Sequence, residues 1–230
     1  MTQQQRRSKK QYPPNQKVLL VEGVVEERLI PYLIEKSGVE WPDDWRNAPV
    51  QIREKDGVEN ILKRSTIEAE VRESERRITG ILLDADDDVA AKWASIRSCC
   101  DPYFPMLHET ETGSAGVIVS DAESGQKLGI WIMPDNQSGG MLETLLLTLV
   151  PGGESEALLK FARDTCREAK QKFAAPYKDR HIQKAEIHTW LAWQDEPGQQ
   201  LHAAIDQQIL DPKSEYAKPF VTWFCKLFEI

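Results

Sequence analysis

The stretch GILLDADDD, residues 80–88, places four aspartates directly behind an aliphatic run. The aliphatic run is typical of a buried strand, and the acids begin where that strand should end. Two interpretations are open for Asp84, Asp86, Asp87 and Asp88. These acids either gather around a divalent cation that offsets their mutual repulsion, or they form the acidic N-terminus of a helix.

A second aliphatic run, KVLLVEG at residues 17–23, also ends in an acid, Glu22. Apolar residues at helical spacing follow at 24–38. Residues 50–57 are a plausible second strand, and residues 58–73 again have helical periodicity. Strands that alternate with helices in this way predict an α/β fold with a mostly parallel sheet flanked by helices.

The same alternation continues toward the C-terminus. Residues 76–84 are the third predicted strand, and residues 89–100 are a predicted helix. Two further strands within 117–135 flank the turn signal SDAESG, so a hairpin is expected there. Residues 139–150 are predicted to be helical, and the pattern beyond residue 151 is entirely helical.

Three parts are therefore expected along the chain. A disordered basic tail is predicted for residues 1–16, an α/β domain for residues 17–150, and a helical C-terminal extension for residues 151–230. The tail has four basic residues within positions 6–10, and these either contact nucleic acid or are simply solvated.

The composition favours a globular, cytoplasmic protein. Hydrophobic residues make up 40% of the chain, yet no apolar stretch approaches the length needed to cross a membrane, roughly 20 residues. The N-terminus lacks the apolar region of a signal peptide. Four cysteines without a CxxC pair predict a reduced compartment and no structural zinc. The net charge of −8 argues against non-specific DNA binding through a basic surface, but it leaves room for an acidic site loaded with metal.

Acidic residues follow three of the predicted strands. Glu22 follows the first, Asp84 and Asp86 follow the third, and Asp135 follows LGIWIMP. Ligands of open α/β sheets bind just beyond the carboxyl ends of parallel strands, so we expect these acids to lie near one another. Hard carboxylate oxygens suit Mg²⁺, which proteins usually hold through one or two carboxylates, waters and substrate phosphate.

The segment LLVEG followed by ILLDADDD resembles the Toprim domain, which topoisomerases, bacterial primases, recombination-repair proteins and the overcoming-lysogenization-defect nucleases share. The signature of that domain is a Glu after the first strand and an Asp-x-Asp after the third. These positions correspond to Glu22, Asp84 and Asp86. The run IWIMPDNQSGGMLETLL is similar to a group of small bacterial Toprim proteins, and the resemblance covers roughly residues 17–150.

The resemblance implies roles for these three acids. Glu22 would act as a general base or as a metal ligand. Its structural alternative is to accept hydrogen bonds from the helix start at Gly23–Val24. Asp84 and Asp86 would bind Mg²⁺ or Mn²⁺ and position a phosphate, with a turn or a helix cap as the alternative.

Three other acids have two open interpretations each. Asp88 is either a third metal ligand or a helix N-cap. Asp135 completes a second metal position or forms an Asx-turn in PDNQSGG. Glu143 points back to the site or into solvent. Asp87 is expected to be solvated surface charge.

Nucleolytic Toprim proteins often use a further basic residue, typically a lysine, beyond the acidic motifs. Lys127 and Lys184 are both candidates, and no motif chooses between them. His108, His181, His188 and His202 make no HExxH-type pair, so surface or interface positions are expected for them.

The resemblance implies a Mg²⁺-dependent nuclease that hydrolyses phosphodiester bonds of DNA or RNA. Many Toprim nucleases act beside an ATPase in defence against phage. The resemblance therefore implies a partner ATPase for this chain. The chain has no GxxxxGK[ST] loop, so any ATP hydrolysis of P-loop type would have to come from elsewhere. The alternative is a regulatory module that binds a metal and a nucleotide or protein without cleavage. Trp190, Trp193 and Trp223 are expected to pack in a core or, alternatively, to dock a partner.

Overall fold

The computed structural model describes residues 16–42, 44–73 and 76–230. The basic tail predicted for residues 1–16 therefore lies outside the described residues, apart from Gln16. No helix in these three ranges is long and apolar enough to cross a membrane.

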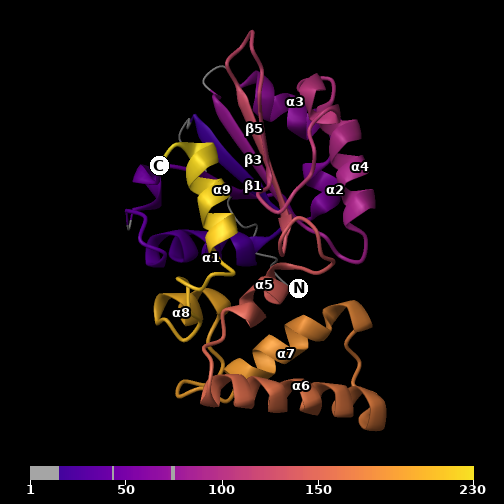
Figure 1. Cartoon of the computed structure of the whole chain (residues 1–230), viewed down its shortest axis with the longest axis vertical. Helices are drawn as coiled ribbons and strands as arrows, with labels where there is room; N and C mark the ends of the chain where they lie inside the picture. The colour runs from indigo at the N-terminus through magenta and orange to yellow at the C-terminus, as the bar shows by residue number, and fades with distance from the viewer. Residues whose placement is uncertain (1–15, 43, 74–75) are drawn as a thin grey trace, which may run out of the picture.

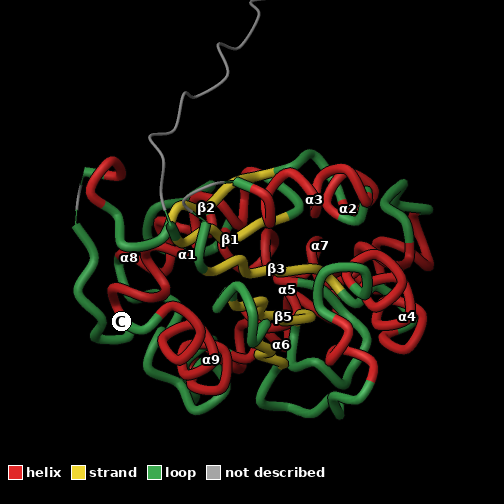
Figure 2. Tube along the Cα trace, turned by 90° about the horizontal axis from the view of Figure 1, so that it is seen from above, coloured by secondary structure: helices red, strands yellow, loops and turns green. Residues whose placement is uncertain are grey.

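The centre of the fold is a sheet with the strand order β2-β1-β3-β5-β4. The strands are β1 (Lys17–Val21), β2 (Gln51–Glu54), β3 (Ile78–Asp84), β4 (Val117–Ser120) and β5 (Lys127–Met133). Strands β2, β1, β3 and β5 are parallel, and the edge strand β4 runs antiparallel to β5. The predicted α/β fold with a mostly parallel sheet is confirmed, and Figure 2 shows the strand order from above.

Helices cover both faces of the sheet (Figure 1). One face packs against α1 (Val24–Lys36) and α9 (Lys218–Phe228), and the other packs against α2 (Val58–Ile61), α3 (Arg64–Arg72) and α4 (Val89–Cys100). The helical segment predicted for residues 58–73 is thus two helices. Short 3₁₀ turns complete the connections: η1 (Trp45–Asn47), η2 (Pro105–His108) and η3 (Asp179–His181).

The two covered faces explain the continuous aliphatic runs. Along β3, Leu82 belongs to the core under α1 and α9, whereas its neighbours Ile81 and Leu83 belong to the core under α2, α3 and α4. Along β5, Trp131 and Ile132 divide in the same way. A strand buried on both faces needs apolar residues at every position, because neither face meets water.

The C-terminal part lies mainly beyond the end of the sheet at which β5 leads into α5 (Figure 1). It consists of α5 (Leu142–Thr148), α6 (Glu154–Phe173), α7 (Ile182–Leu191) and α8 (Leu201–Asp206), and the chain then returns to the sheet as α9. Helix α5 packs against α7, and α8 packs against α1. These contacts hold α7 beside the carboxyl ends of the parallel strands.

Helix α9 completes the core of the sheet rather than forming a separate unit. It packs on β3 and β5, where a Cβ atom at Gly129 would lie 2.2 Å from Leu227 Cδ2, so only glycine allows this close approach. Trp223 and Trp190 are 1% and 0% exposed, as expected for core residues. Trp193 is 39% exposed and lies beside Phe161, with ring centroids 5.5 Å apart.

Candidate functional site

Two of the predicted acids meet where neighbouring strands end. Glu22 directly follows β1, and Asp84 is the last residue of β3, which pairs with β1 in parallel register. The Asp84 N–H donates to Glu22 Oε1 at 2.9 Å. The parallel sheet therefore brings together two residues that are far apart in the sequence, as the strand-end argument predicts.

The start of α5 closes over the same strand ends. The Leu142 N–H donates to Asp84 Oδ1 at 2.9 Å. Asp86 and Gly140 exchange two backbone hydrogen bonds of 2.9 and 2.8 Å, and Asp86 has a positive φ of 54°. A Cβ atom at Gly139 would lie 3.0 Å from the Asp86 carbonyl oxygen. The DADDD loop and the residues before α5 are thus held together by backbone contacts that favour glycine.

Two further carboxylates lie close to Asp84. Glu143, in the first turn of α5, is 3% exposed. Glu26, in the first turn of α1, accepts a hydrogen bond from the Gly23 N–H at 3.1 Å. The structural alternative for Glu22, a contact with the start of this helix, is therefore made by Glu26, while Glu22 accepts from Asp84.

The carboxylates strongly perturb one another. Burial raises the pKa of Asp84 well above its usual range, the charges of Glu22, Glu26 and Glu143 raise it further, and the hydrogen bond from Leu142 lowers it. Burial is also the main cause that raises the pKa of Glu22 and the pKa of Glu26. The carboxylates of the site therefore repel one another, and the positive charge of a bound cation would offset that repulsion.

Two lysines supply part of that charge. Lys184 Nζ lies 3.1 Å from Glu143 Oε1, and Lys92 Nζ lies 3.0 Å from Asp86 Oδ2. Burial lowers the pKa of Lys184, but Glu143, Glu26 and Asp84 outweigh burial and raise it. Lys127 lies at the opposite end of β5, where it forms an ion pair with Glu229. Of the two candidate lysines, the structure brings only Lys184 to the acids.

A cavity of about 390 Å³ opens on this cluster. Its lining includes the carboxylates Glu22, Asp84 and Asp86 together with the basic side chains Arg180, His181 and Lys184. The acids come from the strand ends, and the basic residues come from η3 and α7 of the C-terminal extension. The α/β domain and the extension thus build one site together.

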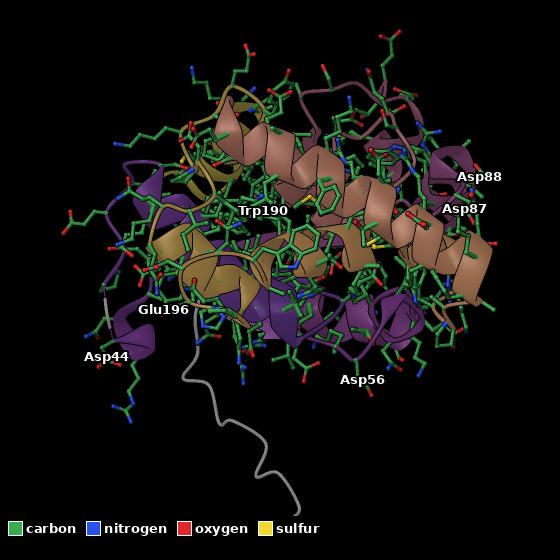
Figure 3. The ribbon with its side chains drawn as sticks, turned by 90° about the horizontal axis from the view of Figure 1, so that it is seen from below. Asp44, Asp56, Asp87, Asp88, Trp190 and Glu196 are labelled. Atoms are coloured by element: carbon green, nitrogen blue, oxygen red, sulfur yellow. The ribbon has the colours of Figure 1, made fainter. Side chains whose placement is uncertain are left out.

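Figure 3 views the molecule from the side of α6 and α7 and helps to locate this region. Asp56, Asp87 and Asp88 lie toward one side of that view, away from Asp44 and Glu196. Asp56 lines the cavity, whereas Asp87 and Asp88 do not. Asp88 Oδ1 accepts from the Ala91 N–H at 2.9 Å and caps α4, and Asp87 is exposed.

Asp135 forms the Asx-turn that was one of its two alternatives. Its Oδ1 accepts from the N–H groups of Gln137 and Ser138 at 3.0 and 2.7 Å, and its Oδ2 accepts from Ser138 Oγ at 2.8 Å. Burial opposes these bonds, but they outweigh it and lower the pKa of Asp135. Asp135 is not part of the cavity lining, so both oxygens serve the turn rather than the site.

The remaining histidines lie apart from the strand ends. His108 forms a close contact with Asp101, and His202 stacks on Tyr32 with ring centroids 5.5 Å apart. His188 follows Lys184 by one turn of α7. Only His181 lines the cavity that contains the acids.

The donor set fits Mg²⁺. Within the three described ranges, no group of three or more His, Cys, Asp or Glu side chains is arranged as a ready metal cage. Mg²⁺ does not require such a cage, because it keeps several waters and needs only one or two protein carboxylates. The raised pKa of Asp84 and the lining by Glu22, Asp84 and Asp86 match a site that a divalent cation would stabilise.

Fold and site together define an α/β protein with a carboxylate-rich cavity at the carboxyl ends of its parallel strands. Residues 16–229 match the model of the family described as "Protein of unknown function (DUF3226)", and the chain belongs to this family. No curated protein and no solved structure matches the chain.

Sequence reasoning missed several residues of the site. Glu26 is the third residue of α1, which begins two residues after Glu22, so an acid in the first turn of the expected helix was a usable signal. Lys92 lies in the first turns of the helix that follows DADDD. Arg180 lies in an irregular segment far along the chain, and only the packing of α7 brings it to the cavity.

Proposed function

We propose that the protein is a Toprim-class enzyme that hydrolyses phosphodiester bonds of nucleic acid, DNA or RNA, with Mg²⁺ or Mn²⁺. The observation that supports this proposal is the contact of Glu22 with Asp84 at adjoining strand ends, inside a cavity that Lys184 and Arg180 also line. Acids alone would repel a phosphodiester, and the basic side chains give its oxygens a place to bind.

Asp84 and Asp86 would hold the metal, with Glu22 beside them as the base. When bound, the ion would neutralise charge on the phosphate and lower the pKa of a coordinated water. Glu143 would remain outside this set, because its charge is offset by Lys184 at 3.1 Å. Asp88 and Asp135, which cap a helix and form a turn, are not needed as ligands.

The protein side chains would handle the proton and the phosphate charge. Glu22, which accepts from the Asp84 N–H at 2.9 Å and lines the cavity, would be the base that accepts a proton from the attacking water. The water oxygen bonds to phosphorus as the bond to the leaving oxygen breaks. Lys184 and Arg180 would offset the charge that develops on the phosphate oxygens.

The wider setting of the enzyme is proposed from the Toprim resemblance. The protein would act in the cytoplasm, in defence against phage, with an ATPase partner that supplies ATP hydrolysis. The net charge of −8 supports recruitment of nucleic acid through such a partner or the bound metal rather than through a broad basic surface.

The test is incubation of the pure protein with plasmid DNA and with RNA, in Mg²⁺, in Mn²⁺ and in EDTA. Asp84→Asn and Glu22→Gln should each lower metal-dependent cleavage by at least about a hundredfold. Asp87→Asn is the matched control, because Asp87 is an exposed acid of the same loop, and it should cleave like the wild type. Absence of cleavage even with the product of a neighbouring ATPase gene would overturn the nuclease proposal.

A non-catalytic binding module is the second candidate. The observation that favours it is the ion pair of Lys184 with Glu143, which already engages the basic residue best placed for a phosphate. Metal binding that is lost in Asp84→Asn, without cleavage of any substrate, would support this candidate over the enzyme.

A further inference from the structure

A second cavity, of about 370 Å³, lies beside the candidate site. It is lined by the first turns of α1, by Glu143 of α5, by α7, and by residues 198–202 leading into α8. Lys184 and the Glu143–Lys184 ion pair join the two cavities, because Lys184 lines both and Glu143 lines the second. Of the residues that line only this second cavity, Glu143 was a candidate site residue from the sequence, whereas Arg28, Gln199 and Gln200 were not.

The lining of this second cavity is basic. Two cations, Arg28 and Lys184, face a single acid, Glu143. Burial lowers the pKa of His188 and the pKa of His202, so these imidazoles add hydrogen-bonding groups rather than fixed positive charge. The remaining side chains are apolar or amide, so the charge balance favours an anion. This is the opposite of the first cavity, where acids predominate.

Two polar groups in the lining have few protein partners: the exposed guanidinium of Arg28 and the buried carbonyl oxygen of Gln199. Within the described chain, the Arg28 guanidinium donates one side-chain hydrogen bond, Nη1 to Gln200 Oε1, and it is long at 3.4 Å. The Gln199 Oε1 atom is buried without a hydrogen-bond partner among the described residues, although Gln199 Nε2 donates to Glu196 and Gln207. A buried acceptor without a donor costs free energy. Because Gln199 Oε1 has almost no accessible surface, a ligand N–H or O–H would remove that cost once the Gln199 side chain had turned toward the cavity.

We propose that this cavity binds a phosphorylated small molecule of about mononucleotide size. Its phosphate would contact Arg28, Lys184 and His188, and a hydrogen-bond donor on the remainder would reach Gln199 Oε1. The volume of about 370 Å³ lies in the range of small-molecule sites, roughly 300–1,000 Å³. Guanidinium and ammonium groups are the usual protein partners of phosphate oxygens.

Binding of the ligand in the second cavity would affect the first cavity through Lys184. Only this effect on cleavage rests on the proposed function. A phosphate that draws Lys184 toward His188 would weaken its ion pair with Glu143, which is buried. The ligand would then change the charge beside Asp84 without entering the candidate active site. Cleavage should therefore respond to the ligand.

The experiment is isothermal titration calorimetry of the full chain in EDTA, so that no metal competes, with 5′-AMP, inorganic phosphate and adenosine as probes. We expect 5′-AMP to bind more tightly than phosphate and adenosine to bind least. Arg28→Ala should weaken 5′-AMP binding roughly 10- to 100-fold, because it removes charge-assisted hydrogen bonds. Arg72→Ala is the matched control, since Arg72 is an exposed arginine on α3 with one ion-pair partner, and it should bind like the wild type.

Val25→Trp gives an independent test, because Val25 lines the cavity and is 41% exposed, so a larger side chain would fill the space without disturbing the core. It should abolish 5′-AMP binding. The proposal is overturned if 5′-AMP does not bind, if Arg28→Ala and Val25→Trp bind it like the wild type, or if only a 5′-phosphorylated trinucleotide binds. Asp84→Asn should retain 5′-AMP binding, so loss of the nuclease proposal would leave this cavity's assignment intact.

Discussion

Two carboxylates of this protein, the buried Glu70 and the half-buried Asp84, have opposite surroundings. Glu70, on α3, is 5% exposed and receives Lys55 Nζ at 2.9 Å and Arg76 Nη2 at 3.0 Å. Arg53 adds a third cation at 3.4 Å. Asp84 instead is surrounded by the acids Glu22, Glu26 and Glu143, with Lys184 paired to Glu143 rather than to Asp84.

The pKa shifts of these two groups have opposite signs for this reason. Burial raises the pKa of Glu70, but the hydrogen bond and charge of Lys55 and the charges of Arg53 and Arg76 outweigh burial and lower it. Burial raises the pKa of Asp84, and the neighbouring acids raise it further. Burial alone therefore does not make a carboxylate functional, and the sign of the surrounding charge separates a structural ion network from a site that lacks a cation.

The largest effect is expected from breaking the network around Glu70. Glu70→Gln keeps the shape of the side chain but leaves Arg53, Lys55 and Arg76 close together without their central anion. The free energy of unfolding should fall by about 3 kcal/mol, measured by urea denaturation. A change below about 0.5 kcal/mol would mean that Glu70 contributes no more than a surface charge.

The pH dependence of the Glu70 network gives the second prediction. Because the pKa of Glu70 is lowered in the folded state, its stabilising contribution is complete above its unfolded pKa, about 4.3. The contribution is lost as the pH falls through the lowered folded pKa. The difference in unfolding free energy between wild type and Glu70→Gln should therefore be constant near neutral pH and shrink below about pH 4. A difference that grows with acid would contradict the assigned sign.

The third prediction concerns Asp84. If the acids around Asp84 bind Mg²⁺, a concentration ten times the dissociation constant should stabilise the fold by about 1.4 kcal/mol. The measurement is the unfolding free energy with and without Mg²⁺, and the stabilisation should disappear in Asp84→Asn. Stabilisation of equal size in that variant would place the ion elsewhere in the protein.

The difference between the surroundings of Glu70 and those of Asp84 could be predicted only in part from the sequence. The mostly parallel sheet and the meeting of Glu22 with Asp84 were predictable, because aliphatic runs ended by acids have few interpretations in an α/β fold. The Glu70 network was not foreseen. Arg53 is on β2, Glu70 is on α3 and Arg76 lies in the loop before β3, so no spacing pattern relates them.

The alternatives that the sequence left open depend on contacts of different range. Asp88 and Asp135 are engaged by residues two or three positions away, so local geometry gave them a cap and a turn. Lys184 could not be chosen over Lys127 from the sequence, because the position of Lys184 depends on how the extension packs. Helix α7 packs on α5 and carries Lys184 to the acids, whereas Lys127 begins β5 at the far end of the sheet.

The smallest effect, and the sharpest contrast with Glu70→Gln, is expected from Asp84→Asn in EDTA. The amide oxygen can still accept from the Leu142 N–H, while the repulsion of Asp84 by Glu22, Glu26 and Glu143 is removed. Asp84→Asn should therefore raise the unfolding free energy by about 1 kcal/mol, whereas Glu70→Gln should lower it.

Asp87→Asn, in the same loop but exposed, should change the unfolding free energy by less than about 0.5 kcal/mol in the same urea titration. If Asp84→Asn instead destabilised the metal-free protein by more than about 1 kcal/mol, the charge of Asp84 would be needed for folding. The acids at the strand ends would then be a second structural network, held by Lys92 and Lys184 as Glu70 is held by its three cations.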